Sequence, residues 1–396
     1  MFHHQQEKER LHQKKKRIAL SDIHKNKKKA QDERHGASEA KHRPPTHVSM
    51  LSCGTDHSAI VTGNGKLYTW GAGISGCLGL GEQANRKRPH VWNFIDIGMF
   101  VHTEHRVTGV SCGEQHTAIV LTSGRVLTFG CGDNGRLGHS DSRPRNKPKV
   151  VESLRDCTIA SVSCGGKFTL LLTSSSGSSG SSSGSDQQRQ PLVLSAGYGQ
   201  SGALGHGDRP TRSARRSDCR TFQIIKTLRG KGPFALSAGG MHSAVLCAGG
   251  DVRTFGFGEK GQLGRFLQNG GSSSDIPTTV KFRGKMRKNV RLVCCGGAHT
   301  LLLDDDNSVW SFGSNDAGQL GLGDRKNRRL PCHVQTLMGK DIIDMSCGMR
   351  HSGVICEQGA CYLFGAGQQG QLGGGSGSGS SRVVSEEGEV GLEREK

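Results

Sequence analysis

The sequence predicts an all-β fold made of repeated four-stranded sheets. One observation is a front half, Cys-Gly-x-x-His followed by an apolar run, with its cysteine at Cys53, Cys112, Cys295 and Cys347. Two copies deviate, because Ala238-Gly239 precedes His242 and Cys164-Gly165 precedes Phe168. A second observation is a back half ending in Leu-Gly, with paired glycines eight positions apart at Gly71/Gly79, Gly130/Gly138, Gly197/Gly205, Gly256/Gly264, Gly313/Gly321 and Gly365/Gly373. These six ends are 59, 67, 59, 57 and 52 residues apart, a spacing typical of blades rather than of helical hairpins.

Each repeat is expected to contain four strands. In the second repeat, residues 107–112, 117–121 and 125–129 are short apolar, β-branched runs, which favour strands. Gly- and Ser-rich stretches separate them, and glycine supplies the positive φ that hairpin turns need. A fourth strand is indicated by a recurring proline three residues before a valine or tryptophan, at Pro89/Trp92, Pro148/Val151, Pro277/Val280 and Pro331/Val334. One such sheet cannot bury both faces, so its neighbours must stack on it, and radial stacking makes a β-propeller.

These residues resemble the regulator of chromosome condensation repeat family, whose members are β-propellers, usually of seven blades. The resemblance rests on Cys-Gly-x-x-His paired in register with Trp/Phe-Gly-x-Gly-x-x-Gly-x-Leu-Gly, and it extends over residues 48–375. Only six repeats are visible. Three alternatives stay open: a six-bladed ring, a missing blade, or a blade too degenerate to recognise.

The propeller is expected to be one domain, 48–375, between disordered tails at 1–47 and 376–396. Residues 1–47 hold thirteen Lys/Arg against six Asp/Glu and almost no aliphatic side chains, too little to offset the entropy of ordering. Two basic clusters there resemble a bipartite nuclear import signal: Lys14, Lys15, Lys16 and Arg17, then Lys25, Lys27, Lys28 and Lys29. A solubility or RNA-adhesion segment is the competing interpretation.

Two further segments break the repeat pattern. The Ser/Gly-rich stretch 173–190 lies where the other repeats have a hairpin turn, so it is expected to be an expanded hairpin tip without a binding role. Residues 382–384 could supply a late strand that closes the ring.

The candidate chemical motifs favour structural roles over catalysis. The recurring cysteines lack metal-ligand spacing, so we expect free core thiols in a reducing compartment, nucleus or cytoplasm, and neither metal nor cofactor. Matches to Gly-x-Gly-x-x-Gly, such as Gly71-x-Gly73-x-x-Gly76, are repeated turns that open no helix, which argues against nucleotide binding. The recurring histidines belong to different blades, which indicates packing and turn hydrogen bonds. No apolar run is long enough for a membrane span, and no secretory signal is visible.

Positive charge gathers in the loops that follow the Leu-Gly ends. Residues 48–381 contain 37 Lys/Arg and 23 Asp/Glu, which is +14 of the net +19. Equivalent loops of a propeller emerge on one face, so we expect a basic surface that attracts DNA, RNA, an acidic protein patch or anionic lipid. Loops that only keep this face soluble are the alternative. The basic rim, as we name this surface, comprises Arg86, Arg88, Arg145, Lys147, Arg209, Arg212, Arg215, Arg216, Arg325, Arg328 and Arg329.

Two functions are compatible with this pattern. The first is a non-enzymatic interaction propeller that acts as a regulator or scaffold and binds a protein, DNA or chromatin, with no small-molecule substrate. The second is implied by the resemblance alone: guanine nucleotide exchange on a Ran-like small GTPase. In the family, exchange is associated with a wedge inserted after the aromatic-Gly of one blade. All six copies here keep the eight-residue interval, so exchange is the alternative rather than the first choice.

Overall fold

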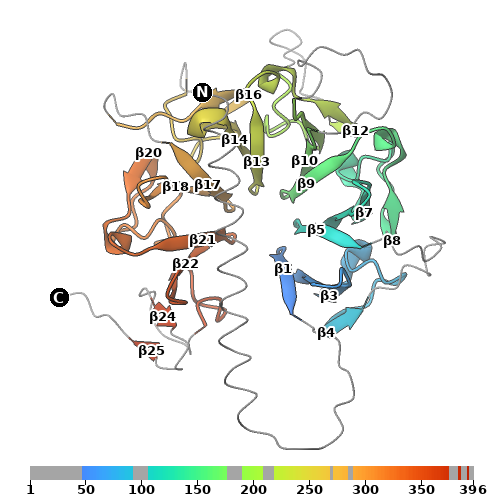
Figure 1. The fold of residues 1–396 in the computed structure, drawn as a ribbon, viewed down its shortest axis with the longest axis horizontal. Helices are drawn as coiled ribbons and strands as arrows, with labels where there is room; N and C mark the ends of the chain where they lie inside the picture. Colours follow the sequence, from blue (N-terminus) through green and yellow to red (C-terminus); the bar gives the residue numbers. More distant parts are fainter. Residues whose placement is uncertain are drawn as a thin grey trace, which may run out of the picture. The chain divides into compact units, whose positions relative to one another are not determined.

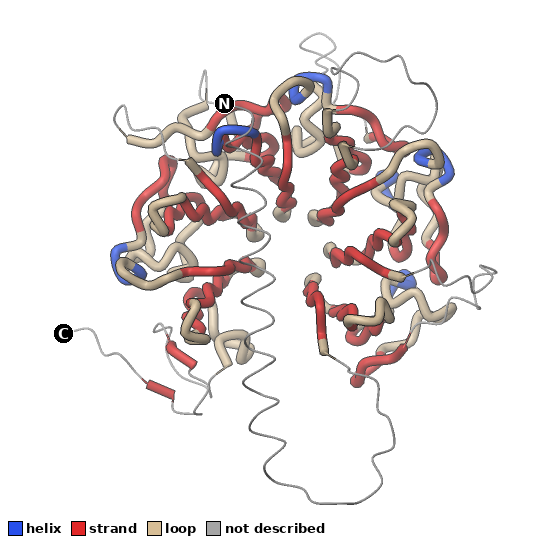
Figure 2. Tube along the Cα trace, in the orientation of Figure 1, coloured by secondary structure: helices blue, strands red, loops and turns tan. Residues whose placement is uncertain are grey.

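The computed structural model describes residues 47–91, 106–175, 190–207, 218–267, 271–283, 289–373, 382–384 and 390–391. The body that begins at residue 47 contains six consecutive antiparallel sheets, arranged around a common axis as blades of a propeller (Figures 1 and 2). The predicted all-β propeller is therefore confirmed, with six blades. The described helical segments are 3-10 turns, none of them long or apolar enough to cross a membrane: Ile74–Gly76, Asp133–Gly135, Glu152–Leu154, Lys226–Leu228, Ala248–Gly250 and Gln335–Leu337.

Each blade begins with its innermost strand and ends with its outermost. Blade one contains β1 (Val48–Cys53), β2 (His57–Thr62), β3 (Leu67–Gly71) and β4 (Arg86–Val91). Blade two contains β5 (Val107–Cys112), β6 (His116–Leu121), β7 (Val126–Gly130) and β8 (Arg145–Val150). Blade three contains β9 (Ile159–Cys164), β10 (Phe168–Thr173), β11 (Val193–Gly197) and β12 (Cys219–Ile224).

The second half repeats this order, with one addition in the last blade. Blade four contains β13 (Pro233–Ala238), β14 (His242–Cys247), β15 (Asp251–Phe257) and β16 (Ser273–Thr279). Blade five contains β17 (Val290–Cys295), β18 (His299–Asp304), β19 (Val309–Gly313) and β20 (Arg328–His333). Blade six contains β21 (Ile342–Cys347), β22 (His351–Cys356), β23 (Cys361–Gly365), β24 (Arg382–Val384) and β25 (Val390–Gly391).

Antiparallel order gives the propeller two distinct faces. The loop face carries the Gly-x-x-His turn between the first two strands and the Leu-Gly loop between the last two, which in blade two are residues 113–115 and 131–144. The opposite hairpin face carries the second-to-third-strand hairpin and the link to the next blade, which here are residues 122–125 and 151–158. Every blade has this order, so equivalent loops emerge on the same face.

The hydrophobic core lies between consecutive blades. Val61 and Leu67 of blade one pack in one cluster with Ile119 and Phe129 of blade two. The repeated Leu-Gly end serves this packing: Gly79 has φ +72°, and an added Cβ would lie 2.8 Å from the ring of Phe129. Glycine is thus required twice here, for its backbone conformation and for the approach of the next blade's aromatic ring.

Within the described part of the chain, the first and last blades each pack against a single neighbouring blade. Among the described residues, no hydrophobic cluster and no backbone hydrogen bond joins blade six to blade one. Val48 of β1 is consequently 53% exposed, whereas its counterpart Val107 in blade two is 3% exposed. Ile355, on the unpaired side of blade six, is 42% exposed.

The late strand at 382–384 does not close the ring. It pairs with β23, as the fourth strand of blade six, and β25 pairs with it in turn. The third-repeat hairpin tip lies largely outside the described residues, because 176–189 are not described, but β10 and β11 flank it as expected.

Candidate interaction face

The loop face surrounds a cavity of about 700 Å³ on the propeller axis. Its wall consists largely of inner-strand ends and Gly-x-x-His turns. Arg350 and Asp316 form an exposed ion pair of 2.9 Å at this cavity. A hydrogen bond from Gln319 is the main cause that lowers the pKa of Asp316. Met241 and Met349 expose 44% and 56% of their surface beside it. The cavity mouth therefore mixes apolar side chains with charges of both signs.

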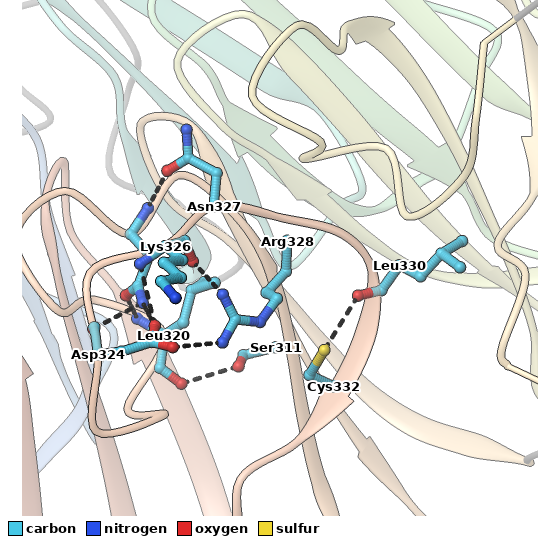
Figure 3. Close-up of polar contacts among 9 residues, drawn as sticks. Ser311, Leu320, Asp324, Lys326, Asn327, Arg328, Leu330 and Cys332 are labelled. Atoms are coloured by element: carbon cyan, nitrogen blue, oxygen red, sulfur yellow. Dashed lines mark hydrogen bonds and ion pairs between the residues drawn. The ribbon is translucent and has the colours of Figure 1, made fainter.

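Three described Leu-Gly loops share one local structure built on an acid and an arginine four residues apart. In blade five, Arg328 Nη2 donates to Asp324 Oδ2 at 2.6 Å, and Nη1 donates to the carbonyl of Lys326 at 2.6 Å (Figure 3). The hydrogen bond from Arg328 is the main cause that lowers the pKa of Asp324. The other two pairs are Glu82–Arg86 and Asp141–Arg145. These three arginines anchor each loop to the start of its outer strand.

The described part of the basic rim follows the outer circumference of the loop face. Its arginines enter the outer strands at one register, given by the pairs Gly71/Arg86, Gly130/Arg145 and Gly313/Arg328. Four other candidates are exposed: Arg88, Lys147, Arg325 and Arg329. The structure therefore separates this positive charge from the axial cavity.

The remaining candidates lie outside the described residues. These are Arg209, Arg212, Arg215 and Arg216 of the third Leu-Gly loop and all residues of the two import clusters. Binding by any residue of the rim stays a prediction.

Sequence reasoning treated all rim arginines alike and missed the loop-anchoring role of three of them. Arg86, Arg145 and Arg328 are half-buried and paired, whereas Arg88 and Arg329 are exposed. The sequence does contain a signal for this pairing. In all three loops an acidic residue lies three residues after the glycine of Leu-Gly, and an arginine lies four residues after that acid. Pairing at this spacing reduces the charge that these arginines can offer to a partner.

The recurring histidines join blades. His242 Nε2 lies 2.9 Å from Thr300 Oγ1 of the next blade, and that hydroxyl donates to the carbonyl of Gln262 at 2.9 Å. Because the hydroxyl has a single proton, the ring must donate from Nε2, which leaves Nδ1 unprotonated. The equivalent pairs are His57–Thr117, His116–Thr169 and His299–Ser352. Burial is the main cause that lowers the pKa of His242 to about 4.

The described residues contain no metal-binding cluster of histidine, cysteine and acidic side chains. The cysteines are free thiols, and burial raises the pKa of both Cys164 and Cys295 to about 12. Two of the recurring five depart from the expected buried position, since Cys53 is exposed and Cys347 is half-buried. They belong to the first and last of the described blades, each of which packs on one described neighbour.

Comparison with known families supports the repeat assignment. The model described as "Regulator of chromosome condensation (RCC1) repeat" matches residues 64–120, 123–172, 249–303 and 306–355, which is more than half of the chain. A second model of the same description matches residues 48–77, 107–136 and 290–319.

Similar proteins are found among ligases, receptors and solved propellers. The E3 ubiquitin-protein ligase HERC2 of Homo sapiens is 31% identical over 301 residues, covering 76% of this chain but only 6% of HERC2. The ultraviolet-B receptor UVR8 of Arabidopsis thaliana is 29% identical over 336 residues, covering 84% of this chain and 68% of UVR8. The crystal structure of Prp20p from Saccharomyces cerevisiae has a TM-score of 0.66 at 18% identity, over 83% of this chain and 74% of Prp20p. That last likeness concerns the fold alone.

Proposed function

The chain belongs to the regulator of chromosome condensation repeat family, and from that premise we propose a non-enzymatic interaction propeller that regulates or scaffolds an acidic partner. The partner, a nucleic acid, chromatin or an acidic protein surface, binds the basic rim. The observation that carries this proposal is the repetition of exposed Arg and Lys near the start of the outer strands of blades one, two and five, where those strands leave the loop face.

The electrostatic argument depends on which charges are exposed to solvent. Arg88, Lys147 and Arg329 are exposed on outer strands that all begin at the loop face. Aligned charges of one sign raise the association rate of an anionic partner and orient it before contact. Aromatic side chains are sparse, with three Trp and three Tyr in the chain, which favours capture of phosphate or carboxylate groups over base stacking.

Charge reversal tests this proposal. We expect the triple variant Arg88→Glu, Lys147→Glu and Arg329→Glu to weaken binding of a fluorescein-labelled DNA duplex and of polyglutamate at least about tenfold. The logarithmic salt dependence for DNA should become shallower by about 2 to 3, because each lost phosphate contact removes released counterions. Fluorescence anisotropy at several salt concentrations measures both.

A control with the same change in charge lies on the hairpin face. It reverses Arg155, Lys226 and Arg229, which are exposed beside the 3-10 turns that link blades. Loss of binding in the rim variant alone supports the rim. Equal loss in both variants would mean that net charge, rather than this face, attracts the partner.

Guanine nucleotide exchange is the second candidate. What favours it is the fold similarity to Prp20p, a protein whose structure was described together with its binding to Gsp1p and histones. Against it stand the six equal Gly-to-Gly intervals, which leave no insertion in this segment of any blade. Release of fluorescent GDP from a panel of small GTPases separates the candidates. Stimulation by substoichiometric protein would make this propeller an exchange factor.

Nuclear import through the two N-terminal basic clusters is proposed from the sequence alone. A fluorescent protein fused to residues 1–47 should accumulate in nuclei. Replacing Lys14, Lys15, Lys16 and Arg17 by alanine should return it to the cytoplasm. A fusion that is cytoplasmic without any replacement would remove the proposal.

A further inference from the structure

The inner strands of neighbouring blades are joined by a repeated serine contact. The backbone N–H of Cys112 donates to Ser52 Oγ of the preceding blade at 2.9 Å, and that of Cys295 donates to Ser237 Oγ at 2.8 Å. The other two contacts of this kind are Cys164 to Ser111 and Ala238 to Ser163, both at 2.9 Å. Covalent geometry then places the two Cα atoms of each pair less than about 7 Å apart.

The interface between blades five and six departs from this rule. Cys294 stands where the other blades have serine, and its partner position in blade six is Cys347. The Cys347 thiol lies 3.6 Å from the carbonyl oxygen of Cys294. Both residues are half-buried. Among the five interfaces between the described blades, this is the one at which both equivalent positions are cysteine.

We propose that Cys294 and Cys347 form a reversible disulfide that locks blade six to blade five when the protein meets a small disulfide oxidant such as glutathione disulfide. The upper limit on the Cα separation of the equivalent pairs is compatible with the range of about 4.4 to 6.8 Å that disulfides span. Blade six packs on blade five only, among the described residues, and end repeats held by one interface are those that separate most easily. The bond would therefore act where the propeller is weakest.

The chemistry balances with this oxidant as the electron acceptor. The Cys294 thiol loses its proton and attacks glutathione disulfide, whose S–S bond breaks and releases one glutathione. The Cys347 thiol then loses its proton and attacks the Cys294 sulfur, which releases the second glutathione. Two protein thiols are oxidised to one disulfide, and glutathione disulfide is reduced to two thiols.

The environment of the Cys347 thiol determines which of the two thiol–disulfide exchange steps is slower. Burial raises the pKa of the Cys347 thiol well above its ordinary value, so its thiolate is scarce near neutral pH. Closure of the bond should therefore be slower than the first attack and should accelerate as the pH rises. The adjacent Cys295 competes poorly, because successive side chains of a strand point to opposite faces and its own thiol is buried.

Peptide mapping tests the proposal on the full-length protein. After equilibration in glutathione buffers from reduced to oxidised, free thiols are blocked and the protein is digested with trypsin. We expect residues 292–325 linked to residues 341–350 in the oxidised buffers, and separate peptides in the reduced ones. The oxidised protein should also melt about 5 °C higher, as expected for a disulfide that closes a loop of this length.

The chain supplies its own control substitutions. Cys294→Ser restores the residue found in the other blades, and Cys347→Ala copies Ala238 of blade four, so both variants should fold. Each should abolish the link and the melting shift. A link between Cys294 and Cys295, a glutathione adduct on Cys53 or Cys294 without the link, or a Cys347 that stays alkylatable in every buffer would each overturn the proposal.

Discussion

Acid should destabilise this propeller through the histidines that join its blades. His242, buried in β14, is held neutral by its surroundings, and burial lowers its pKa from 6.5 to about 4. Its Nδ1 has no hydrogen-bond partner among the described residues. Protonation would thus create a buried, unpartnered N–H on a charged ring, which is costly. In the unfolded chain the same ring is protonated freely below about pH 6.5.

The magnitude follows from these two pKa values. A lowered folded pKa means that the unfolded state binds more protons between about pH 6.5 and pH 4, so stability falls as the pH falls through that window. For His242 the loss between pH 7.5 and pH 5 is about 2 kcal/mol. Burial also lowers the pKa of His57 to about 4 and of His299 to about 3, so the losses accumulate over several interfaces.

A variant taken from the chain itself isolates one histidine. Blade three has Phe168 at this position, and blade four has Ser243 at the position equivalent to Thr300, so His242→Phe with Thr300→Ser copies a residue pair that the chain already contains. Urea unfolding followed by circular dichroism at pH 7.5 and 5 gives the free energy of unfolding at each pH. The difference between the two pH values should shrink by about 2 kcal/mol in this variant and stay unchanged in His90→Phe, an exposed site. An unchanged difference in the double variant would refute the buried-histidine explanation.

Three further predictions concern packing, backbone and loops. Val107→Ala should lower the free energy of unfolding by about 2 kcal/mol, because the side chain is buried. Val48→Ala, at the equivalent but exposed site, should change it by less than about 0.5 kcal/mol. Equal losses would show that another part of the protein covers Val48. Gly130→Ala, where φ is +104° and the new Cβ would lie 2.5 Å from a backbone oxygen, should melt well below Gly318→Ala, where φ is +83° but no atom lies within 4 Å. Arg328→Gln should cost less than about 1 kcal/mol in urea unfolding, because the pair that it breaks is near the surface, and a larger loss would mean that its loop supports the blade.

The repeat signature was sufficient to predict the blades because each recurring residue has one structural role. Gly79 admits the ring of Phe129, and His116 reaches the hydroxyl of Thr169 in the next blade. Those tasks recur at interfaces, so periodicity in the sequence predicts stacking in space. The strand limits also agreed closely, since 117–121 was expected and β6 is His116–Leu121.

Charge pairing and the ends of the array were harder to predict. Counting arginines did not reveal that Arg145 is paired with Asp141, because a composition argument ignores partners within a loop. Nor could periodicity show that Val48 is exposed, since Val48 holds the same repeat position as Val107 and differs in having no described blade before its own. A repeat predicts its interfaces but not where the series of interfaces stops.

Specificity for a partner should therefore depend on the positions that do not repeat. Within the Gly-x-x-His turns, the glycine and the histidine or phenylalanine are buried or half-buried and serve the interfaces, but the two residues between them change from blade to blade. In chain order these pairs are Thr55-Asp56, Glu114-Gln115, Gly166-Lys167, Gly240-Met241, Gly297-Ala298 and Met349-Arg350. All of them except Asp56 and Gln115 line the axial cavity, whereas the basic rim lies at the circumference. We therefore expect the rim to attract an acidic partner and the cavity mouth to discriminate among partners by shape and apolar contact. Substitution of Met241 and Met349 should then change which partner binds without changing the salt dependence, and reversal of the rim charges should do the opposite.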